Sequence, residues 1–384
     1  MKPKVLLAQN SAFIANRLPR AARALKQAGY DVEILNWDRG INSEVIQTAS
    51  SQFAQEGIKV HSIYCGETPY GKGILTAFQK GKFIYKVVKF LLKNGHNYQV
   101  VHAIDFDLAY PTYLAKKIKR KLTFKFIYDI ADFVETFHSP IPKPIRRQIS
   151  KLSANIMEHA DLIIIPDENR LINIPSTFYS KIQVISNTID PPKKVREYPI
   201  DKSEKKINIL YYGALSKDRG IKLLLQLARL ENVAIWIAGK GELQEEIVQH
   251  AEKSENIHFL GYLEFDQILS VVQQVHLIYM VYDPSYQHNQ IASPNKLFEA
   301  LYLGKPCIVT EGTSIDQFVE KNNIGYVVTF DVAHLVDTIK SITIDELELK
   351  GENAKLLYPH YSWDKTRKTL LNIYYSITNN GDTI

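Results

Sequence analysis

The sequence predicts an α/β protein with two similar domains, each built on a parallel sheet flanked by helices. Short apolar runs rich in β-branched residues alternate with helical patterns along the whole chain. The polar, proline-rich stretch 190–206 interrupts this alternation and has the composition of a linker. The 384 residues are enough for two domains of ordinary size. Two such domains predict a cleft between them, with ligands at the carboxyl ends of the strands.

The predicted elements form one series on each side of the linker. Strands in the first half are expected at 4–8, 32–35, 100–102, 124–128, 162–165 and 183–185. Strands in the second half are expected at 207–212, 233–238, 257–260, 277–280, 307–309 and 326–328. A first crossover helix is expected over 17–28, with Gly29 at its end and a core face of Leu18, Ala21, Ala22, Leu25 and Ala28. The predicted boundaries are a first domain at 1–189, a linker at 190–206, a second domain at 207–361 and a capped amphipathic helix at 362–384.

The sequence Ser-Pro-Asn-Lys-Leu-Phe-Glu-Ala-Leu-Tyr-Leu-Gly-Lys-Pro, which begins at Ser293, predicts a short buried helix with both ends marked. Ser293 suits the N-cap, Pro294 the first helical position and Gly304 the C-terminal cap. The middle and end of the helix are apolar nearly all round, except for Glu299. A buried carboxylate needs hydrogen-bond partners, so Glu299 is either a ligand-binding group or a structural one held by a nearby Arg or Tyr.

The start of this helix is a candidate anion site. The backbone N–H groups of Asn295, Lys296 and Leu297 lie in the first turn, where a helix leaves such groups without partners, and Lys296 adds a positive charge. A diphosphate at the helix start and hydroxyl groups at Glu299 would together suit a nucleotide sugar.

Two strand-to-turn segments in the second half carry glycines and cations. Gly213 follows a predicted strand and permits close backbone approach, and Lys217 and Arg219 supply charge where a diphosphate could lie. Gly239 and Gly241 stand between the next strand and a helix. Neither half contains the fuller glycine fingerprint that a Rossmann oxidoreductase needs after a strand, so that class is disfavoured.

Composition and charge limit where the chain works and what it binds. The two cysteines, Cys65 and Cys307, form no disulfide framework or metal-ligand cluster, which favours a reducing, cytoplasmic compartment. The N-terminal apolar run is too short for a signal peptide, and no stretch reaches the length of a membrane span. The net charge of +6 is uneven, because residues 1–185 carry +11 and residues 186–384 carry −5. We therefore expect the first domain to meet an anionic surface.

Two basic stretches contribute to this asymmetry. Lysines interleave with apolar residues over 72–93, and a second basic cluster covers 116–121. A basic amphipathic helix can lie on the anionic inner face of a cell membrane, with each cation contributing roughly 1 kcal/mol. The alternative is a solvated helix face whose lysine stems cover the edge of the core. No recognition motif or stacking platform accompanies the charge, so nucleic acid is not an expected partner.

Several segments along the chain together resemble a known family. They are Lys4-Val-Leu-Leu-Ala, the stretch from Asn16 to Val32, Val100-Val-His102-Ala-Ile-Asp105, Ile127-Tyr-Asp129-Ile-Ala-Asp132, and, most strongly, Ser293 to Glu299 with Gly304-Lys-Pro306. Over nearly the whole chain they resemble the retaining glycosyltransferases of the GT4 type, which have the GT-B fold of two Rossmann-like domains facing across a cleft. The subgroup that the chain resembles builds bacterial surface polysaccharides such as capsule, O-antigen or exopolysaccharide.

The resemblance implies a metal-independent transferase that moves a sugar from a UDP- or GDP-sugar to a glycan or lipid-linked glycan with retention. Glu299 would bind ribose hydroxyls, the amides of Lys296 and Leu297 would hold the distal phosphate, and the C-terminal helix would cross back to the first, acceptor-binding domain. The implied donor-binding residues are Gly213, Lys217, Arg219, Gly241, Leu263, Ser293, Asn295, Lys296, Leu297 and Glu299. The absence of an Asp-x-Asp run near a donor-site strand end in the second half agrees with metal independence.

The expected catalytic groups are Arg219 and Glu299 on the donor side and Asp132 on the acceptor side. Asp132 belongs to a set of strand-end aspartates, with Asp105, Asp107 and Asp129, that either orient acceptor hydroxyls or cap helices. His102, which ends a predicted strand, is equally open between a role in the cleft and a structural one.

The chain also departs from the family pattern. Ile291 stands where the family has an acid eight residues before Glu299, Ala214 where it often has an Arg, and Ala131 where it often has a His. The glycine pair often found after the first strand is absent from the loop 10–15. These departures favour one alternative, a degenerate homologue that binds nucleotide sugar or glycan without turnover. A nucleotide-sugar epimerase of the same fold is a second alternative.

Overall fold

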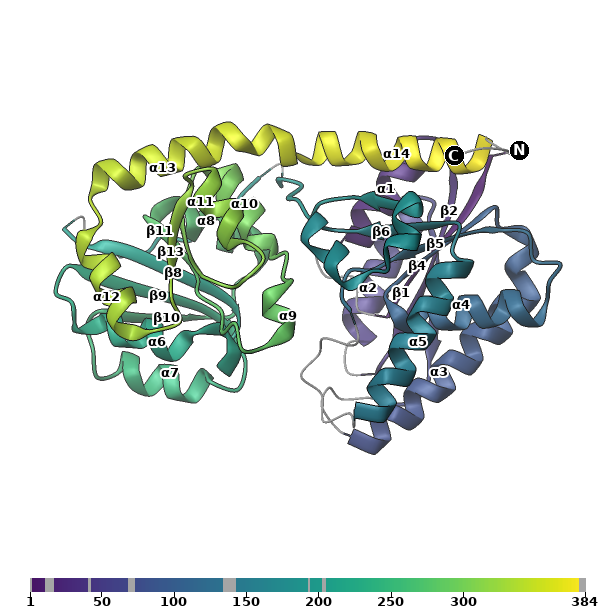
Figure 1. Ribbon diagram of the computed structural model, residues 1–384, viewed down its shortest axis with the longest axis horizontal. Helices are drawn as coiled ribbons and strands as arrows, with labels where there is room; N and C mark the ends of the chain where they lie inside the picture. The colour runs from purple at the N-terminus through teal and green to yellow at the C-terminus, as the bar shows by residue number, and fades with distance from the viewer. Residues whose placement is uncertain are drawn as a thin grey trace. The chain divides into compact units, whose positions relative to one another are not determined.

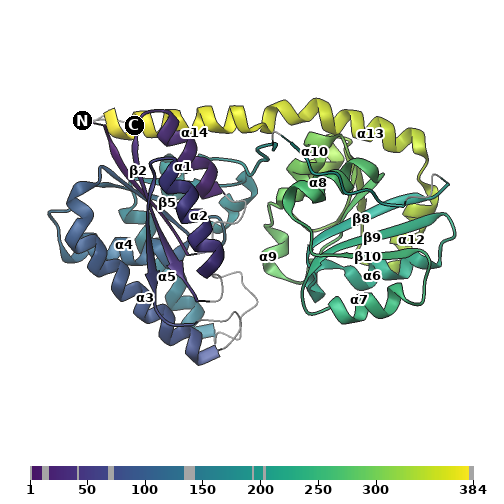
Figure 2. The ribbon, with the colours of Figure 1, turned by 180° about the vertical axis from the view of Figure 1, so that it is seen from behind.

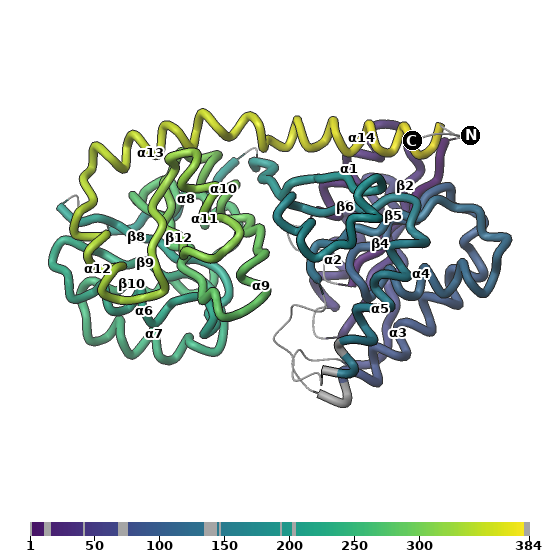
Figure 3. The backbone as a smooth tube through the Cα atoms, in the orientation of Figure 1, coloured from purple at the N-terminus to yellow at the C-terminus, as the bar shows by residue number. Residues whose placement is uncertain are grey.

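The computed structural model describes residues 2–10, 17–40, 43–67, 73–133, 143–192, 194–201 and 205–379. The chain divides into two compact units, which we call unit 1, Met1–Ser186 with Thr366–Ile384, and unit 2, Asn187–Lys365. Strands and helices alternate in each of them (Figure 3). The predicted α/β class and the two parallel-sheet domains are confirmed.

Unit 1 is built on a parallel sheet, which in the described residues has seven strands in the order β3-β2-β1-β4-β5-β6-β7. The strands are β1 Lys4–Gln9, β2 Asp31–Asp38, β3 Lys59–Tyr64, β4 Val100–Ile104, β5 Lys125–Asp129, β6 Leu162–Ile165 and β7 Ile182–Val184. The helices are α1 Arg17–Gln27, α2 Ser43–Gln55, α3 Gly73–Asn94, α4 Phe106–Ile118 and α5 Lys143–His159. Helices α1 and α2 cover one face of the sheet, and α3, α4 and α5 cover the other (Figures 1 and 2). The strand order reverses between β1 and β4, where sheets of this kind bind ligands.

The C-terminal helix α14, Trp363–Asn379, packs on unit 1 beside α1 (Figure 1). Its apolar face, Leu370, Ile373, Tyr374 and Ile377, joins the core formed by β1, β2, α1 and α2. These side chains recur at helical spacing, which explains why the 362–384 segment is recognisable as an amphipathic helix.

Unit 2 repeats the architecture with a parallel sheet in the order β10-β9-β8-β11-β12-β13 within its described residues. The strands are β8 Ile207–Ala214, β9 Val233–Lys240, β10 Ile257–Gly261, β11 Leu277–Met280, β12 Cys307–Thr310 and β13 Gly325–Val328. The helices are α6 Ile221–Gln226, α7 Gln244–Ala251, α8 Phe265–Gln274, α9 Gln287–Gln290, α10 Asn295–Leu303, α11 Asp316–Lys321, α12 Val332–Ser341 and α13 Ile344–Leu357. The strand order reverses between β8 and β11.

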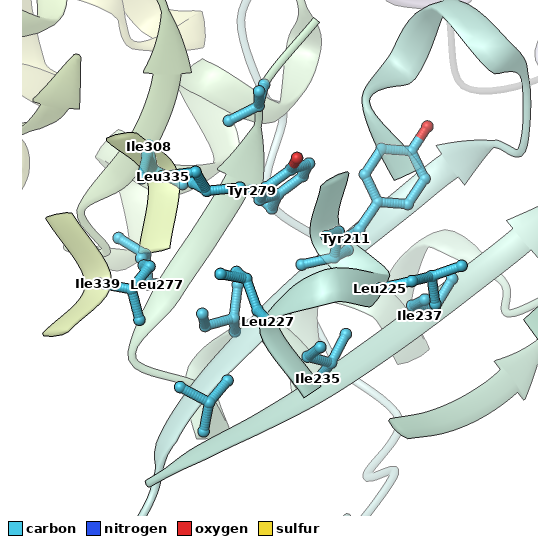
Figure 4. Close-up of a cluster of buried hydrophobic side chains, with 14 of the residues drawn as sticks. Tyr211, Leu225, Leu227, Ile235, Ile237, Leu277, Tyr279, Ile308, Leu335 and Ile339 are labelled. Atoms are coloured by element: carbon cyan, nitrogen blue, oxygen red, sulfur yellow. The ribbon is translucent and has the colours of Figure 1, made fainter. Parts of the chain in front are cut away.

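One face of the unit 2 sheet packs into a dry core (Figure 4). Ile235 and Ile237 of β9 and Leu277 of β11 meet Leu335 and Ile339 of α12, and all five are fully buried. Side chains of this kind contribute about 1.5–3 kcal/mol each when removed from water. This core holds the carboxyl ends of β8 and β11 in a fixed relation.

Every predicted strand is present, and one observed strand, β3, was not predicted. Strand β3 lies at the edge of its sheet, and its residues are exposed or half-buried. It therefore lacks the apolar run that marks the buried strands. Helix α1 ends at Gln27, so Ala28 lies beyond it and is exposed, contrary to its expected place on the core face.

The first basic stretch forms α3, although Lys72 lies outside the described residues. Phe83, Val87 and Leu91 are buried in unit 1, while Phe78 and Tyr85 are 61% and 66% exposed. The second basic cluster begins in the last turn of α4, and two of its lysines, Lys116 and Lys119, donate to carbonyl groups of unit 1. In the described part of the chain, no helix combines the length and hydropathy needed to cross a bilayer.

Candidate functional site

The tips of β8 and β9 approach each other so closely that only glycine fits there. Gly239 has a φ of 146°, and a Cβ atom on it would lie 1.9 Å from the carbonyl oxygen of Gly213. A Cβ atom on Gly241 would lie 2.5 Å from the carbonyl oxygen of Leu215. The two predicted turn segments are therefore packed against one another at the carboxyl edge of the unit 2 sheet.

Lys296 of α10 lies over the same edge. Its Nζ stands 4.1 Å from the ring centre of Tyr211 and 5.2 Å from that of Tyr212, both on β8. A Cβ atom on Gly213 would lie 3.2 Å from this Nζ, so the glycine leaves room for the ammonium group. Among the described residues, no carboxylate lies within ion-pair distance of Lys296. Burial first, and the nearby Arg219 second, lower the pKa of Lys296 to about 7.

Arg219 reaches this edge from the turn after β8. Its guanidinium stacks on the ring of Tyr282 at 4.6 Å, directly after β11, and its Nε lies 3.3 Å from Asp218 Oδ2. Tyr282 also lies under Lys296, with the Nζ 5.8 Å from its ring centre. Arg219, Tyr282 and Lys296 thus gather at the β8–β11 reversal point, where a doubly wound sheet binds its ligand.

Asp218 and His288 belong to this site but were not predicted from the sequence. His288 Nε2 lies 2.9 Å from Asp218 Oδ2, and Asp218 is 8% exposed. Burial alone would raise the pKa of Asp218, but hydrogen bonds from His288 and Ser216 and the charge of Arg219 hold it well below its usual range. Because an ionised carboxylate only accepts, Nε2 of His288 must be the donor. Its Nδ1 is buried and has no hydrogen-bond partner.

Helix α10 begins one residue later than predicted. Pro294 occupies the N-cap position and Asn295 is the first helical residue, so Ser293 does not cap the helix. Ser293 is buried, and its carbonyl accepts a bond from Asn187 Nδ2 at 2.7 Å. No side chain caps this helix start, although Gly304 ends the helix as expected with a φ of 62°. The N–H of Leu297 donates to the carbonyl of Pro294 at 3.1 Å, so of the two amides predicted to hold the distal phosphate only that of Lys296 has no partner within the helix start.

Glu299 is buried in α10 with 7% of its surface exposed. The hydroxyl of Tyr212 donates to Glu299 Oε2 at 2.5 Å, and both groups are buried. Burial, and then the charge of Glu299, raise the pKa of Tyr212 well above its ordinary value. This bond is the contact expected of a structural carboxylate held by a nearby Tyr.

The other predicted donor residues are less closely connected to this cluster. Lys217 is exposed, and its Nζ lies 3.7 Å from Oε2 of Glu242, which follows Gly241 in the turn after β9. Leu263 is buried in the cluster that contains Tyr212, while Asn295 is exposed. Leu297 is buried at the start of α10.

The predicted acceptor-side aspartates meet at the carboxyl edge of the unit 1 sheet. Asp132 is exposed, and its Oδ1 lies 3.7 Å from Arg170 Nη2. Asp129 is 2% exposed, and its Oδ2 lies 3.4 Å from Arg17 Nε. Burial would raise the pKa of Asp129, but Arg17 and a hydrogen bond from His102 lower it overall.

His102 connects this edge to α14. Its Nε2 lies 3.2 Å from Asp129 Oδ2 and its Nδ1 lies 2.7 Å from the hydroxyl of Tyr374. All three side chains are buried. The predicted alternative of a structural histidine thus matches its contacts.

The described residues contain no group of three or more His, Cys, Asp or Glu placed to hold a metal ion. Of the predicted glycine-poor loop 10–15, residues 11–15 lie outside the described residues.

Part of unit 2 matches a known protein family. Residues 195–356, which lie within unit 2, match the family model for glycosyl transferases group 1. The chain is 23% identical over 235 residues to an uncharacterized glycosyltransferase of Methanocaldococcus jannaschii. That match covers 54% of this chain and 57% of the relative, so the chain spans just over half of the relative's length.

Three solved structures share the architecture of the whole chain. Sucrose-phosphate synthase from Thermosynechococcus elongatus has a TM-score of 0.73 at 15% identity and covers 98% of this chain and 100% of its own. Anabaena HepE, in complex with UDP-glucose, has a TM-score of 0.69 at 15% identity, with coverages of 97% and 99%. A proposed UDP-N-acetylglucosamine 2-epimerase from Listeria monocytogenes has a TM-score of 0.64 at 15% identity, with coverages of 100% and 98%. These likenesses establish the GT-B fold.

Proposed function

We propose that this protein is a glycosyltransferase that moves a sugar from a nucleotide sugar to a hydroxyl group of a glycan or lipid-linked glycan. The observation that carries the proposal is Lys296, whose pKa is lowered by burial and by Arg219 although the charge of Glu299 acts in the opposite direction. Among the described residues Lys296 has no ion-pair partner within 4 Å. A diphosphate would compensate the cost of burying this charge, since it would bring negative charge to Lys296, Arg219 and the uncapped start of α10. The group 1 match spans all three.

In this proposal the site works by stabilising the leaving nucleoside diphosphate. As the sugar–phosphate bond breaks, negative charge develops on the phosphate oxygens, and Arg219 and Lys296 lie where they can neutralise it. The first N–H groups of α10 add a further positive potential. Glu299 accepts hydrogen bonds from the ribose hydroxyls. Gly213 keeps the approach open, because a larger residue there would displace Lys296.

We further propose a UDP-sugar as the donor, transfer with retention and no required metal. Support for UDP comes from the shared fold with Anabaena HepE, which is described in complex with UDP-glucose. Retention, metal independence and a role in bacterial surface-polysaccharide synthesis are supported by the sequence resemblance. In the same proposal, the domain at 1–189 binds the acceptor, residues 207–361 bind the donor, and Asp132 acts on the acceptor side.

A second, separate proposal concerns the exposed side of α3. Phe78 and Tyr85 are largely exposed there, and Lys82 Nζ lies 4.5 Å from the ring centre of Phe78. Aromatic rings beside lysines suit an anionic lipid surface. Flotation with vesicles containing anionic lipid at low salt should carry the protein upward, and a Phe78→Ser, Tyr85→Ser variant should float less. A wild-type protein that stays at the bottom of the gradient would remove this proposal.

The transferase proposal is tested by following a radiolabelled UDP-glucose with and without a pool of glycan and lipid-linked acceptors. A transferase places label on an acceptor only when the acceptor is present. An epimerase, favoured by the Listeria structure, would change the donor sugar with no acceptor. A binding protein, favoured by Ile291 and Ala131, would leave the label in the donor under both conditions. Either of the last two outcomes would contradict the proposal.

A further inference from the structure

Asp105 stands at the β1–β4 reversal point of unit 1 in a conformation that aspartate rarely adopts. It follows β4 directly, and its φ of 61° and ψ of 168° fall in a region occupied almost only by glycine. Its N–H donates to the carbonyl of Asp129 at 2.8 Å, and its Oδ1 accepts from the N–H of Asp132 at 2.9 Å. A strained residue of this kind persists where the surrounding structure holds it, and such residues cluster at functional sites.

The carboxyl group of Asp105 makes no hydrogen bond to the start of the helix that follows it. Asp105 occupies the N-cap of α4, yet its side chain makes no capping bond to that helix. Among the described residues, the N–H of Asp132 is the one hydrogen-bond donor to this carboxyl group, and it reaches only Oδ1. Asp105 therefore occupies the cap position without capping α4 through its side chain, and its second carboxyl oxygen is available to a ligand.

Two neighbours of Asp105 also have polar atoms without partners. Asp129 is 2% exposed, and its Oδ1 has no hydrogen-bond partner. Arg170 is 4% exposed, and its Nε has none, while its Nη2 reaches Asp132. Buried polar atoms are nearly always paired, so this acceptor and this donor at one edge are both available to a polar ligand.

We propose that Asp105 contacts a hydroxyl group of the sugar acceptor, with Asp129 and Arg170 completing the contact. A hydroxyl group both donates and accepts, and this edge offers an unpaired acceptor, Asp129, and an unpaired donor, Arg170. An ion fits less well, because the carboxylates of Asp129 and Asp132 already face the guanidinium groups of Arg17 and Arg170. The inference rests on the proposed function, and it adds Asp105, which accepts from the N–H of Asp132, to the acceptor-side residues.

The protonation state of Asp105 gives the contact a pH dependence. Burial first, and the charge of Asp132 second, raise the pKa of Asp105 to about 8, with further contributions from Asp129 and Asp107. The cations nearby are Arg17, which faces Asp129, Arg170, and, on α3, Lys80, whose Nζ reaches Asp107 Oδ1 at 2.5 Å. At pH 7 the carboxyl group is therefore neutral and can donate as well as accept. Sugar affinity should fall as the pH rises through about 8.

The test measures glycoside binding by saturation-transfer NMR at pH 6 to 9.5, with the whole 384-residue chain and in the presence of UDP. The three ligands are octyl glucoside, octyl galactoside and octyl N-acetylglucosaminide. Asp105→Ala should weaken binding at least tenfold. Asp105→Asn should bind within about threefold of wild type and lose the pH dependence, since an amide mimics the neutral acid. Glu158→Ala, an exposed position on α5, is the control. UDP binding is followed in the same samples, so a lost UDP shift would report failure of the donor proposal instead.

Three results would overturn the inference. These are unchanged glycoside binding by Asp105→Ala, affinity that increases above pH 8, and a wild-type protein that binds UDP but none of the three glycosides. Asp105→Gly provides a check that does not depend on the ligand, because glycine relieves the backbone strain. Its melting temperature should equal or exceed that of wild type by about 2–4 °C while glycoside binding is lost. A clear fall in melting temperature would instead indicate that the side chain of Asp105 stabilises the fold, and it would contradict a role in ligand binding.

Discussion

Replacing Lys296 by Met should make the fold more stable while it weakens donor binding. Methionine keeps the length of the side chain over Tyr211 but removes the charge. The pKa of Lys296, lowered from 10.5 to about 7, corresponds to on the order of 4–5 kcal/mol of charge burial. Cation–π contacts with the neighbouring rings return about 0.5–2 kcal/mol of that cost. We therefore expect Lys296→Met to raise the free energy of unfolding by about 2 kcal/mol or more at pH 6.

The pH dependence of this effect has a defined sign. Below pH 7, Lys296 is protonated in both the folded and the unfolded chain, so the full cost of burying the charge applies. Between pH 7 and 10.5 the folded chain releases the proton first, and the stability of the wild type rises with pH. The stability difference between variant and wild type should therefore shrink by about 1.4 kcal/mol for each pH unit between 7 and 9.

Urea unfolding at pH 6 and pH 9 measures the stability change, and calorimetric titration with UDP-glucose measures binding. Loss of one charge-assisted contact costs about 1.5–3 kcal/mol, which is at least tenfold in affinity. Lys222→Met is the matched control, because this lysine of α6 is 61% exposed and pairs with Glu246 on the surface. A Lys296→Met protein that is less stable than wild type at pH 6, or that binds UDP-glucose equally well, would refute the reasoning.

Two further substitutions test the packing around the site by urea unfolding. Tyr212→Phe removes the 2.5 Å bond to the buried Glu299 and should lower the free energy of unfolding by about 1.5–3 kcal/mol. No change in stability would mean that the carboxylate is satisfied without Tyr212. Gly239→Ala places a Cβ atom 1.9 Å from the carbonyl of Gly213 and should cost about 3 kcal/mol or leave the protein unfolded. Gly81→Ala, in the middle of α3 with no atom within 4 Å, should instead add about 0.5–1 kcal/mol, and a comparable loss at both positions would contradict the steric argument.

The fold could be predicted from the sequence because its strands are short, apolar and buried on both faces. Strands such as β11, with four fully buried residues, leave no ambiguity about their place in a parallel sheet. The exposed edge strand β3 carries no such signal. The predicted start of α10 was one residue too early. Ser293 was expected at the N-cap and Pro294 at the first helical position, whereas Pro294 is the N-cap and Asn295 the first helical residue.

The residues of the candidate site could be predicted where a short segment has a recognisable pattern of its own. Lys296 and Glu299 lie on one helix, and its glycine and proline marks identify that helix. The pair of Asp218 and His288 joins positions 70 residues apart, and neither residue is unusual in its own segment. The strain at Asp105 is equally invisible, since no local pattern predicts a positive φ for an aspartate after a strand.

The measurement that tests the central claim most directly is thermal stabilisation of the protein by a panel of UDP-, GDP-, ADP- and CMP-sugars. A ligand that binds the folded state raises the melting temperature by mass action. We expect one nucleotide class, the UDP-sugars, to raise it, and we expect Glu299→Ala to reduce donor affinity at least tenfold, about 1.4 kcal/mol, while Glu320→Ala on α11 does not. No shift with any member of the panel, or an undiminished shift in a folded Glu299→Ala protein, would contradict the account.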